Sequence, residues 1–217
     1  MHIKELTLLT TDLLGTKQFY EQLLGFRIFA GASDSISFAI GQSVLTFNLC
    51  ANQMHPKYHF AFNIPCNQLD DALTRLAQRI SFIASAKSFI IDFPNWNAKA
   101  IYFFDNNRNI VELIARADLK NASDREFNAD AILCISELGL VDDEPLKVAA
   151  KLIEQTGITY FEKGPMREDF VALGNDNGLF VIPRTGRVWY PTDQPAEKWK
   201  ICAVVEVNGK LHRLEFH

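Results

Sequence analysis

Three residues that can act as acids, bases or metal ligands stand in segments that are otherwise mostly apolar. Glu5 lies in "KELTLLTT", where a strand period of two puts Leu6 and Leu8 on the face opposite to Glu5. Glu112 interrupts the apolar run "NIVELIA", where a buried carboxylate without a partner would be costly. His59 stands in the strand-like segment "YHFAFNIP". The residues alone leave two interpretations open: a solvated or hydrogen-bonded side chain, or a polar group that faces a cavity.

A repeated order of elements would position these side chains. Residues 3–50 are predicted to form one strand, one helix and three short strands. Asp12 or Thr16 can cap the start of the helix, and Gly25 ends it. The apolar stripe of this helix is predicted to comprise Leu14, Phe19, Leu23 and Leu24.

The same order then recurs. A strand at 58–65 is followed by a helix near 67–80 and by β segments at 81–93, 98–105 and 108–116. Alternation places three apolar residues of the strand on one face (Phe60, Phe62, Ile64) and three others on the opposite face (His59, Ala61, Asn63). A third copy begins at "AILCISELGL". Glu137 follows Glu5 by the same number of residues as Gly157 follows Gly25.

These patterns predict an α+β protein built from repeated βαβββ units that form cupped mixed sheets, about three units plus a truncated fourth. The expected domains are 1–116, with two units, and 131–217, with one unit and the truncated copy. The polar segment 117–130 is the predicted linker.

The segments "ELTLLTTDLLGTKQFYEQLLGF", "YHFAFNIP" and "AIYFFDNNRNIVELIAR" resemble the vicinal-oxygen-chelate superfamily. This superfamily includes glyoxalase I, bleomycin-resistance proteins, fosfomycin-resistance proteins and extradiol ring-cleaving dioxygenases. The resemblance covers residues 3–116 and is weaker over 130–185. It implies an active site inside a cupped sheet, with metal ligands on the first and last strands of two paired units.

By this resemblance Glu5, seven residues before Asp12, takes the first ligand position. His59 and the catalytic Glu112 take the other two, and Thr46 stands at an equivalent position assigned to substrate binding. The loop "DNNRNIVE" departs from the family pattern D-P-x-G-N-x-x-E, because Asn106 and Arg108 replace the usual Pro and Gly.

One imidazole and two carboxylates suit Mn²⁺, Ni²⁺, Co²⁺, Fe²⁺ or Zn²⁺ and leave open coordination positions. Such a site would chelate a small substrate through two neighbouring oxygens and polarise them. The resemblance therefore implies a lyase or isomerase of the glyoxalase kind, a group transferase or a ring-cleaving dioxygenase. The alternative is a metal-free protein that sequesters a ligand, like the bleomycin-resistance members.

Further candidates come from the later units. Tyr102 is assigned as a catalytic acid or hydrogen-bond donor, with packing as its alternative role. Segment 183–199 either closes over the cup or packs as a tail; in the first case Arg184 or Arg187 binds a substrate carboxylate. Glu137 has no acidic counterpart at Val181 in the last strand of its unit, which argues against a second complete metal site.

Composition limits the kinds of partner and the compartment that can be expected for the protein. The net charge of −4 gives no reason to expect nucleic acid, and no apolar run approaches the length that crosses a membrane. The four cysteines are scattered without C-x-x-C spacing, as in reduced cytoplasmic proteins. Whether units pair within one chain or between two chains of a homodimer stays open.

Overall fold

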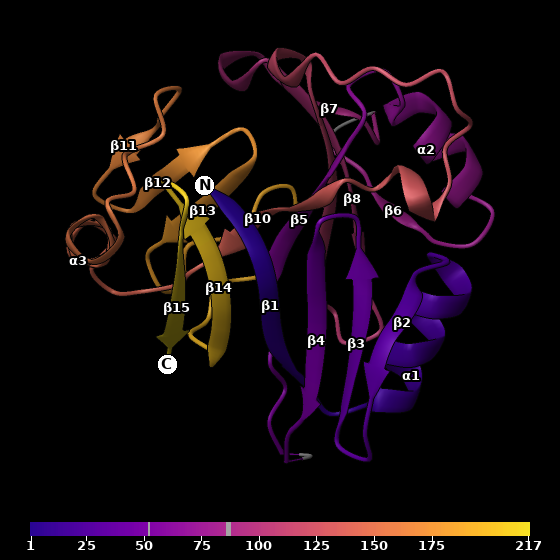
Figure 1. Ribbon diagram of the computed structural model, residues 1–217, viewed down its shortest axis with the longest axis horizontal. Coiled ribbons are helices and arrows are strands. Elements are labelled where there is room, and N and C mark those ends of the chain that lie inside the picture. The colour runs from indigo at the N-terminus through magenta and orange to yellow at the C-terminus, as the bar shows by residue number, and fades with distance from the viewer. Residues whose placement is uncertain (52, 86–87) are drawn as a thin grey trace.

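The computed structural model describes residues 1–51, 53–85 and 88–217. Its elements follow the predicted order of βαβββ units and end in a hairpin (Figure 1). The first unit consists of β1 (His2–Thr10), α1 (Leu13–Lys17) continued by the π-helix η1 (Gln18–Leu23), β2 (Arg27–Gly31), β3 (Ser35–Ile40) and β4 (Ser43–Leu49).

The second unit splits one of its strands into two short pieces, β6 and β7, which both pair with β8. Its elements are β5 (His59–Ile64), α2 (Leu69–Leu76), β6 (Phe82–Ile83), β7 (Ile91–Phe93), η2 (Pro94–Trp96), β8 (Ala98–Phe104) and β9 (Ile110–Arg116). The predicted β segment 81–93 includes residues 86 and 87, which lie outside the described residues.

The third unit and the hairpin complete the chain. They comprise β10 (Cys134–Gly139), α3 (Pro145–Thr156), β11 (Met166–Arg167), β12 (Phe170–Asn175), β13 (Gly178–Pro183), β14 (Ile201–Val207) and β15 (Lys210–Phe216). The hairpin turns at Asn208 and Gly209, both with positive φ. It stands where the sequence suggests a truncated fourth unit.

The strands join in one curled sheet whose main path is β2-β3-β4-β1-β10-β5-β9-β8-β6. Within each unit the first and last strands pair in parallel: β1 with β4, β5 with β9, and β10 with β13. Between units, β5 pairs antiparallel with β10, and β1 pairs antiparallel with β14. The first strand of the second unit therefore lies beside that of the third, and β1 has β14 and, at Ile3, also β10 as antiparallel neighbours. In this chain the antiparallel neighbour of β5 is thus β10 and not β1, the strand that carries Glu5.

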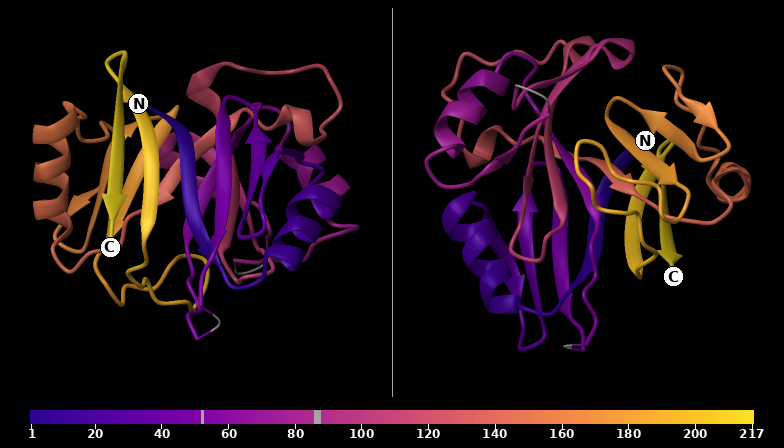
Figure 2. Two further views of the ribbon diagram at one scale, coloured as in Figure 1. Left: turned by 60° about the horizontal axis from the view of Figure 1, so that its bottom comes forward. Right: turned by 180° about the vertical axis from the view of Figure 1, so that it is seen from behind.

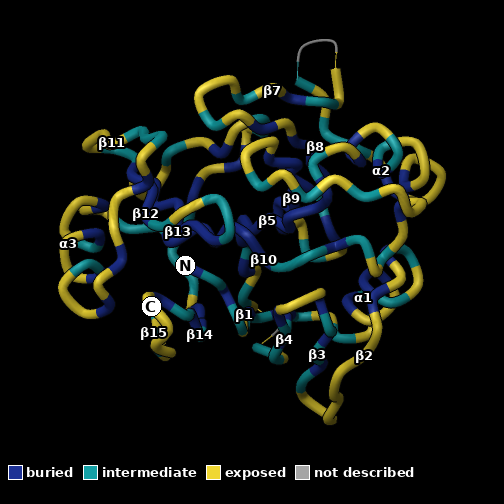
Figure 3. Tube along the Cα trace, turned by 45° about the horizontal axis from the view of Figure 1, so that its top comes forward, coloured by how far each residue is buried: buried dark blue, intermediate teal, exposed yellow. Residues whose placement is uncertain are grey.

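The strands separate a large core from a second, smaller apolar cluster. In β5, Phe60, Phe62 and Ile64 lie in the large core, whereas Ala61 belongs to the second cluster, which confirms the predicted alternation. The helices lie at the ends of the molecule, α3 at one end and α1 with α2 at the other (Figure 2). Strands β5, β9 and β10 run through the buried middle of the fold (Figure 3). Side chains on the face of the second cluster can therefore be polar only if they find partners there.

Segment 117–130 packs against α2. The backbone N–H of Phe127 donates to Asp71, and Arg75 pairs with Glu126 at 3.1 Å. The predicted domain boundaries remain a prediction, although the pairing of β5 with β10 crosses the predicted linker. Within the described ranges, no helix is both long and apolar enough to cross a bilayer.

Candidate functional site

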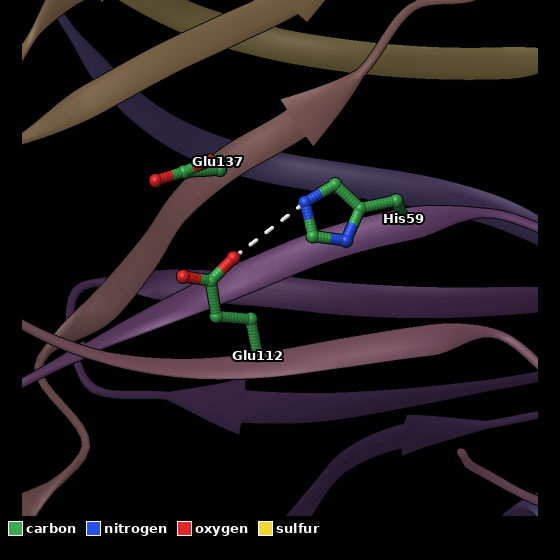
Figure 4. A group of neighbouring side chains, drawn as sticks. All are labelled: His59, Glu112 and Glu137. Atoms are coloured by element: carbon green, nitrogen blue, oxygen red, sulfur yellow. Dashed lines mark ion pairs between the residues drawn. The ribbon is translucent and has the colours of Figure 1, made fainter. Parts of the chain in front are cut away.

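Three ligand-type side chains converge at the junction of β9, β5 and β10 (Figure 4). Strand β5 lies between the other two, and Ala61 pairs with Glu112 of β9 on one side and with Glu137 of β10 on the other. His59 precedes Ala61 by two residues, so its side chain shares the same face. One ligand atom from each of His59, Glu112 and Glu137 lies within 4.8 Å of the others. Ala61, which carries only a methyl group, thus stands between the two carboxylates in the strand register.

All three residues of this group are buried, with exposed fractions of 6% for His59, 2% for Glu112 and 3% for Glu137. The Nδ1 atom of His59 lies 3.2 Å from the carbonyl oxygen of Ile110. When Nδ1 carries the proton and donates there, the lone pair of Nε2 points into the site. Nε2 lies 3.6 Å from Oε2 of Glu112, the contact drawn in Figure 4.

Burial decides the protonation of the group. It lowers the pKa of His59 to about 4, so the imidazole is neutral near pH 7. Burial, together with the nearby charge of Glu137, raises the pKa of Glu112 well above its usual value. Burial also raises the pKa of Glu137, and Arg116 opposes that rise. A neutral imidazole is the form that binds metals, and a cation placed here would relieve the repulsion between the two carboxylates.

Tyr102 lies beside the group. It pairs with Glu112 across β8 and β9, and its side chain lines the same cavity as Glu112. Burial and the nearby carboxylates raise the pKa of Tyr102 well above its usual value, so the phenol keeps its proton and can donate it. The ring lies 6.4 Å from that of His59. Tyr102 therefore lies next to the group, and its role as a catalytic acid or hydrogen-bond donor stays a prediction.

A cavity of about 320 Å³ opens above the group. Its wall carries six aromatic residues: Phe93, Trp96, Tyr102, Phe170, Trp189 and Tyr190. Two arginines also line it. Arg187 pairs with Asp169 at 3.2 Å and its guanidinium lies 4.7 Å from the ring centroid of Phe170, and Arg167 is exposed. The cavity has the size and the mostly apolar wall of a small-molecule site.

The segment 183–199 contributes to this cavity through Arg187, Trp189 and Tyr190. The indole of Trp189 lies 4.7 Å from the imidazole of His59, measured between ring centroids. A Cβ atom on Gly139 would stand 2.8 Å from Cη2 of Trp189, so the absence of a side chain there makes room for the indole. The segment also packs against the third unit, because Lys198 pairs with Asp142 and Asp143, so both arrangements considered for it find contacts in the structure.

Three of the predicted site residues lie elsewhere. Glu5 is exposed on β1, where it pairs with Val44 of β4 and Val204 of β14. The Thr46 hydroxyl is hydrogen-bonded to Ser37 at 2.8 Å. Arg184 is exposed and donates to the carbonyl oxygen of Glu168 at 3.3 Å. None of these side chains lines the cavity.

The group found in the structure therefore differs from the predicted set in its third member, because β5 has β10 rather than β1 as its neighbour. Glu137 stands beside His59 and Glu112 where Glu5 was expected. In the sequence, Glu137 was noted only as the counterpart of Glu5 in the third unit, without an acidic partner at Val181.

Arg116 was missed altogether. It ends β9 on the same face as Glu112, is fully buried, and donates a charge-assisted hydrogen bond to Glu137. The sequence feature that could have identified Arg116 is its position at the end of an apolar strand. It follows Glu112 by an even number of residues, so the two side chains share one face of the strand.

Comparison with known proteins identifies the family to which the chain belongs. The model of the Glyoxalase/Bleomycin resistance protein/Dioxygenase superfamily matches residues 2–113, about half of the chain. The chain therefore belongs to this superfamily. No protein of curated function gave a match.

Several solved structures are similar to this chain at low sequence identity, and the first described here shares its fold. A candidate dioxygenase from Bacillus subtilis has a TM-score of 0.62 at 17% identity, covering 84% of this chain and 63% of its own. This chain thus spans less than two thirds of that protein. A lactoylglutathione lyase from Agrobacterium tumefaciens is 23% identical over 51% of this chain and 90% of its own, with a TM-score of 0.43. The fosfomycin resistance protein FosX from Listeria monocytogenes, solved with Mn(II), is 19% identical over 54% of this chain and 90% of its own, with a TM-score of 0.42.

Proposed function

We propose that the protein is a divalent-metal-dependent enzyme that acts on a small substrate with two neighbouring oxygens. The observation that carries the proposal is the convergence of His59, Glu112 and Glu137 at the base of the aromatic cavity. In this proposal Glu137 replaces Glu5 as the third ligand.

The donor set fits a divalent cation. It offers a neutral imidazole nitrogen and two carboxylates from three adjacent strands, which is a three-sided arrangement with room for further ligands. Carboxylate and imidazole donors suit Mn²⁺, Fe²⁺, Co²⁺, Ni²⁺ and Zn²⁺. Charge also favours a cation, because two buried carboxylates lie close together and Arg116 accompanies only one of them.

The side chains around the group have separate tasks. A bound divalent metal would supply Lewis acidity to the substrate oxygens that it chelates. Tyr102 would donate a hydrogen bond or a proton to a substrate oxygen from its position beside Glu112. Trp96, Phe170 and Trp189 would hold the substrate body and exclude water, and Arg187 would bind an anionic substituent. A lyase or isomerase, a group transferase and a dioxygenase are all compatible with these tasks.

Elemental analysis tests the proposal. Protein purified without chelator and without a histidine tag is expected to carry stoichiometric metal. Glu137→Gln is expected to lose the metal, and Glu5→Gln is the matched control that keeps it. Retention of metal in Glu137→Gln together with loss in Glu5→Gln would refute the ligand set. A metal-free wild type that takes up none of these ions on soaking would refute the metal-dependent function.

The second candidate is a metal-free ligand-binding protein. The ion pair between Arg116 and Glu137 favours it, because the guanidinium neutralises one buried carboxylate without a metal ion. A metal-free wild type that still binds small aromatic ligands would support this candidate.

We further propose that the protein acts in a reducing compartment such as the cytoplasm, since its four cysteines are free thiols. We also propose that the protein forms a homodimer, and light scattering of the purified chain would test this oligomeric state.

A further inference from the structure

Behind the third member of the site lies a buried arginine. Arg116 belongs to β9, four residues after Glu112, and its side chain has no exposed surface. Its Nη2 donates to Oε1 of Glu137, and its Nη1 lies 3.4 Å from Oδ1 of Asp176. In the described part of the chain its Nε has no hydrogen-bond partner. The guanidinium is thus held by two carboxylates, one of which belongs to the candidate metal site.

The second carboxylate connects Arg116 to the surface. Oδ2 of Asp176 lies 2.6 Å from Nζ of Lys163, and the same Nζ lies 2.7 Å from Asp118. Lys163 also donates to the carbonyl oxygen of Trp96 at 3.2 Å. Charges of alternating sign therefore run from Glu137 in the site to the half-exposed Asp118. The guanidinium of Arg116 is held by a carboxylate on each of two sides.

The ring of Trp96 completes the surroundings of Arg116. The guanidinium carbon lies 5.4 Å from the centroid of this ring, which is one wall of the cavity. The indole Nε1 of Trp96 donates to the carbonyl oxygen of Gly164 at 2.8 Å. The ring is therefore held by a hydrogen bond, and the guanidinium of Arg116 lies at cation–π distance from it.

We infer that Arg116 is a positioning residue for the metal site, which holds Glu137 by one carboxylate oxygen and leaves the other oxygen directed to a cation shared with His59 and Glu112. This inference rests on the proposed function. Ligand residues of metal sites are commonly oriented by such partners, and losing one typically weakens metal binding by about 10- to 100-fold.

Geometry explains why an arginine stands here. A planar guanidinium can bind two carboxylates at fixed angles, whereas a lysine ammonium is a point charge that fixes no direction. Glu137 reaches the site from a neighbouring unit, and its carboxylate has more rotational freedom than the imidazole ring of His59. Arg116 removes that freedom, and it offsets one of the two negative charges that the site must hold in the buried interior.

Metal affinity tests the inference. Chelator-treated wild type, Arg116→Gln, Arg116→Lys and Asp176→Asn would be titrated with Co²⁺ by calorimetry, and the visible Co²⁺ spectrum would report the ligand geometry. Arg75→Gln is the matched control, because Arg75 also bridges two carboxylates, Asp71 and Glu126, but lies exposed on α2. We expect the dissociation constant to rise by about 10- to 100-fold in Arg116→Gln. Arg116→Lys should show a smaller rise and an altered spectrum, and the control should match wild type.

The outcomes separate the inference from the proposed function. Tight binding by wild type with unchanged affinity and spectrum in both Arg116 variants would overturn the inference and leave the metal site standing. No Co²⁺ binding by wild type would overturn both. If Arg116→Gln does not fold, Arg116→Lys decides, because it keeps the positive charge. Asp176→Asn should weaken binding less than Arg116→Gln, since it leaves the contact with Glu137 in place; a larger effect would contradict the assigned role.

Discussion

Glu137→Ala is expected to destabilise the metal-free protein by about 3–5 kcal/mol, besides abolishing metal binding. The reason is that Arg116 has no exposed surface and would lose its nearest anionic partner. The remaining contact with Asp176, at 3.4 Å, is weaker and is shared with Lys163. Urea unfolding of chelator-treated protein measures the loss of stability, and metal titration measures the loss of binding.

A double variant separates the two effects of Glu137→Ala. Arg116→Met combined with Glu137→Met replaces the buried ion pair by apolar side chains of similar length. Such replacements often cost little or no stability, so the double variant should recover much of the loss while still binding no metal. If Glu137→Ala were as stable as wild type, the ion pair between Glu137 and Arg116 would not be the buried, interdependent contact described above.

Ala61→Val is expected to disrupt metal binding by filling the space between the ligands. Ala61 is fully buried and stands directly between Glu112 and Glu137 in the strand register. Two added methyl groups would push the carboxylates apart or occupy the place of the cation. We expect affinity for Co²⁺ to fall on the order of 100-fold, the upper end of what displaced ligand geometry costs.

Ala100→Val is the matched control for Ala61→Val. Ala100 is equally buried in the same apolar cluster but lies on β8, outside the three strands that carry the ligands. Overpacking should cost each variant about 1–3 kcal/mol of stability, so stability alone does not distinguish them. Equal metal affinity in the two variants would contradict the position assigned to the cation.

Local sequence patterns were sufficient for most of the elements, and together with the family resemblance they indicated two members of the candidate group, His59 and Glu112. Alternation in β5 predicts which residues face the core, and a carboxylate inside an apolar strand identifies Glu112, because burying it without a purpose is costly. The helix of the first unit was less accurate. Leu14 was assigned to its apolar stripe but is 66% exposed, and the helix changes to π geometry from Gln18 onward. That change alters the spacing of the residues that share a face.

The third member could not be predicted in the same way, because it depends on long-range strand pairing. Glu5 and Glu137 occupy equivalent positions in the first and third units, so local patterns do not distinguish them. What decides between them is which first strand lies beside β5, and in the structure this is β10. Val181 carries no acid, but this does not argue against the group, because the second carboxylate beside Glu137 comes from Glu112 of the second unit.

The location of the metal tests the central claim most directly. Crystals grown or soaked with Mn²⁺ or Co²⁺ would be measured at the absorption edge of the metal. The account predicts an anomalous peak within coordination distance, about 2.0–2.2 Å, of Nε2 of His59 and of carboxylate oxygens of Glu112 and Glu137. A peak at Glu5, or crystals of soaked protein without a peak at His59, would contradict it.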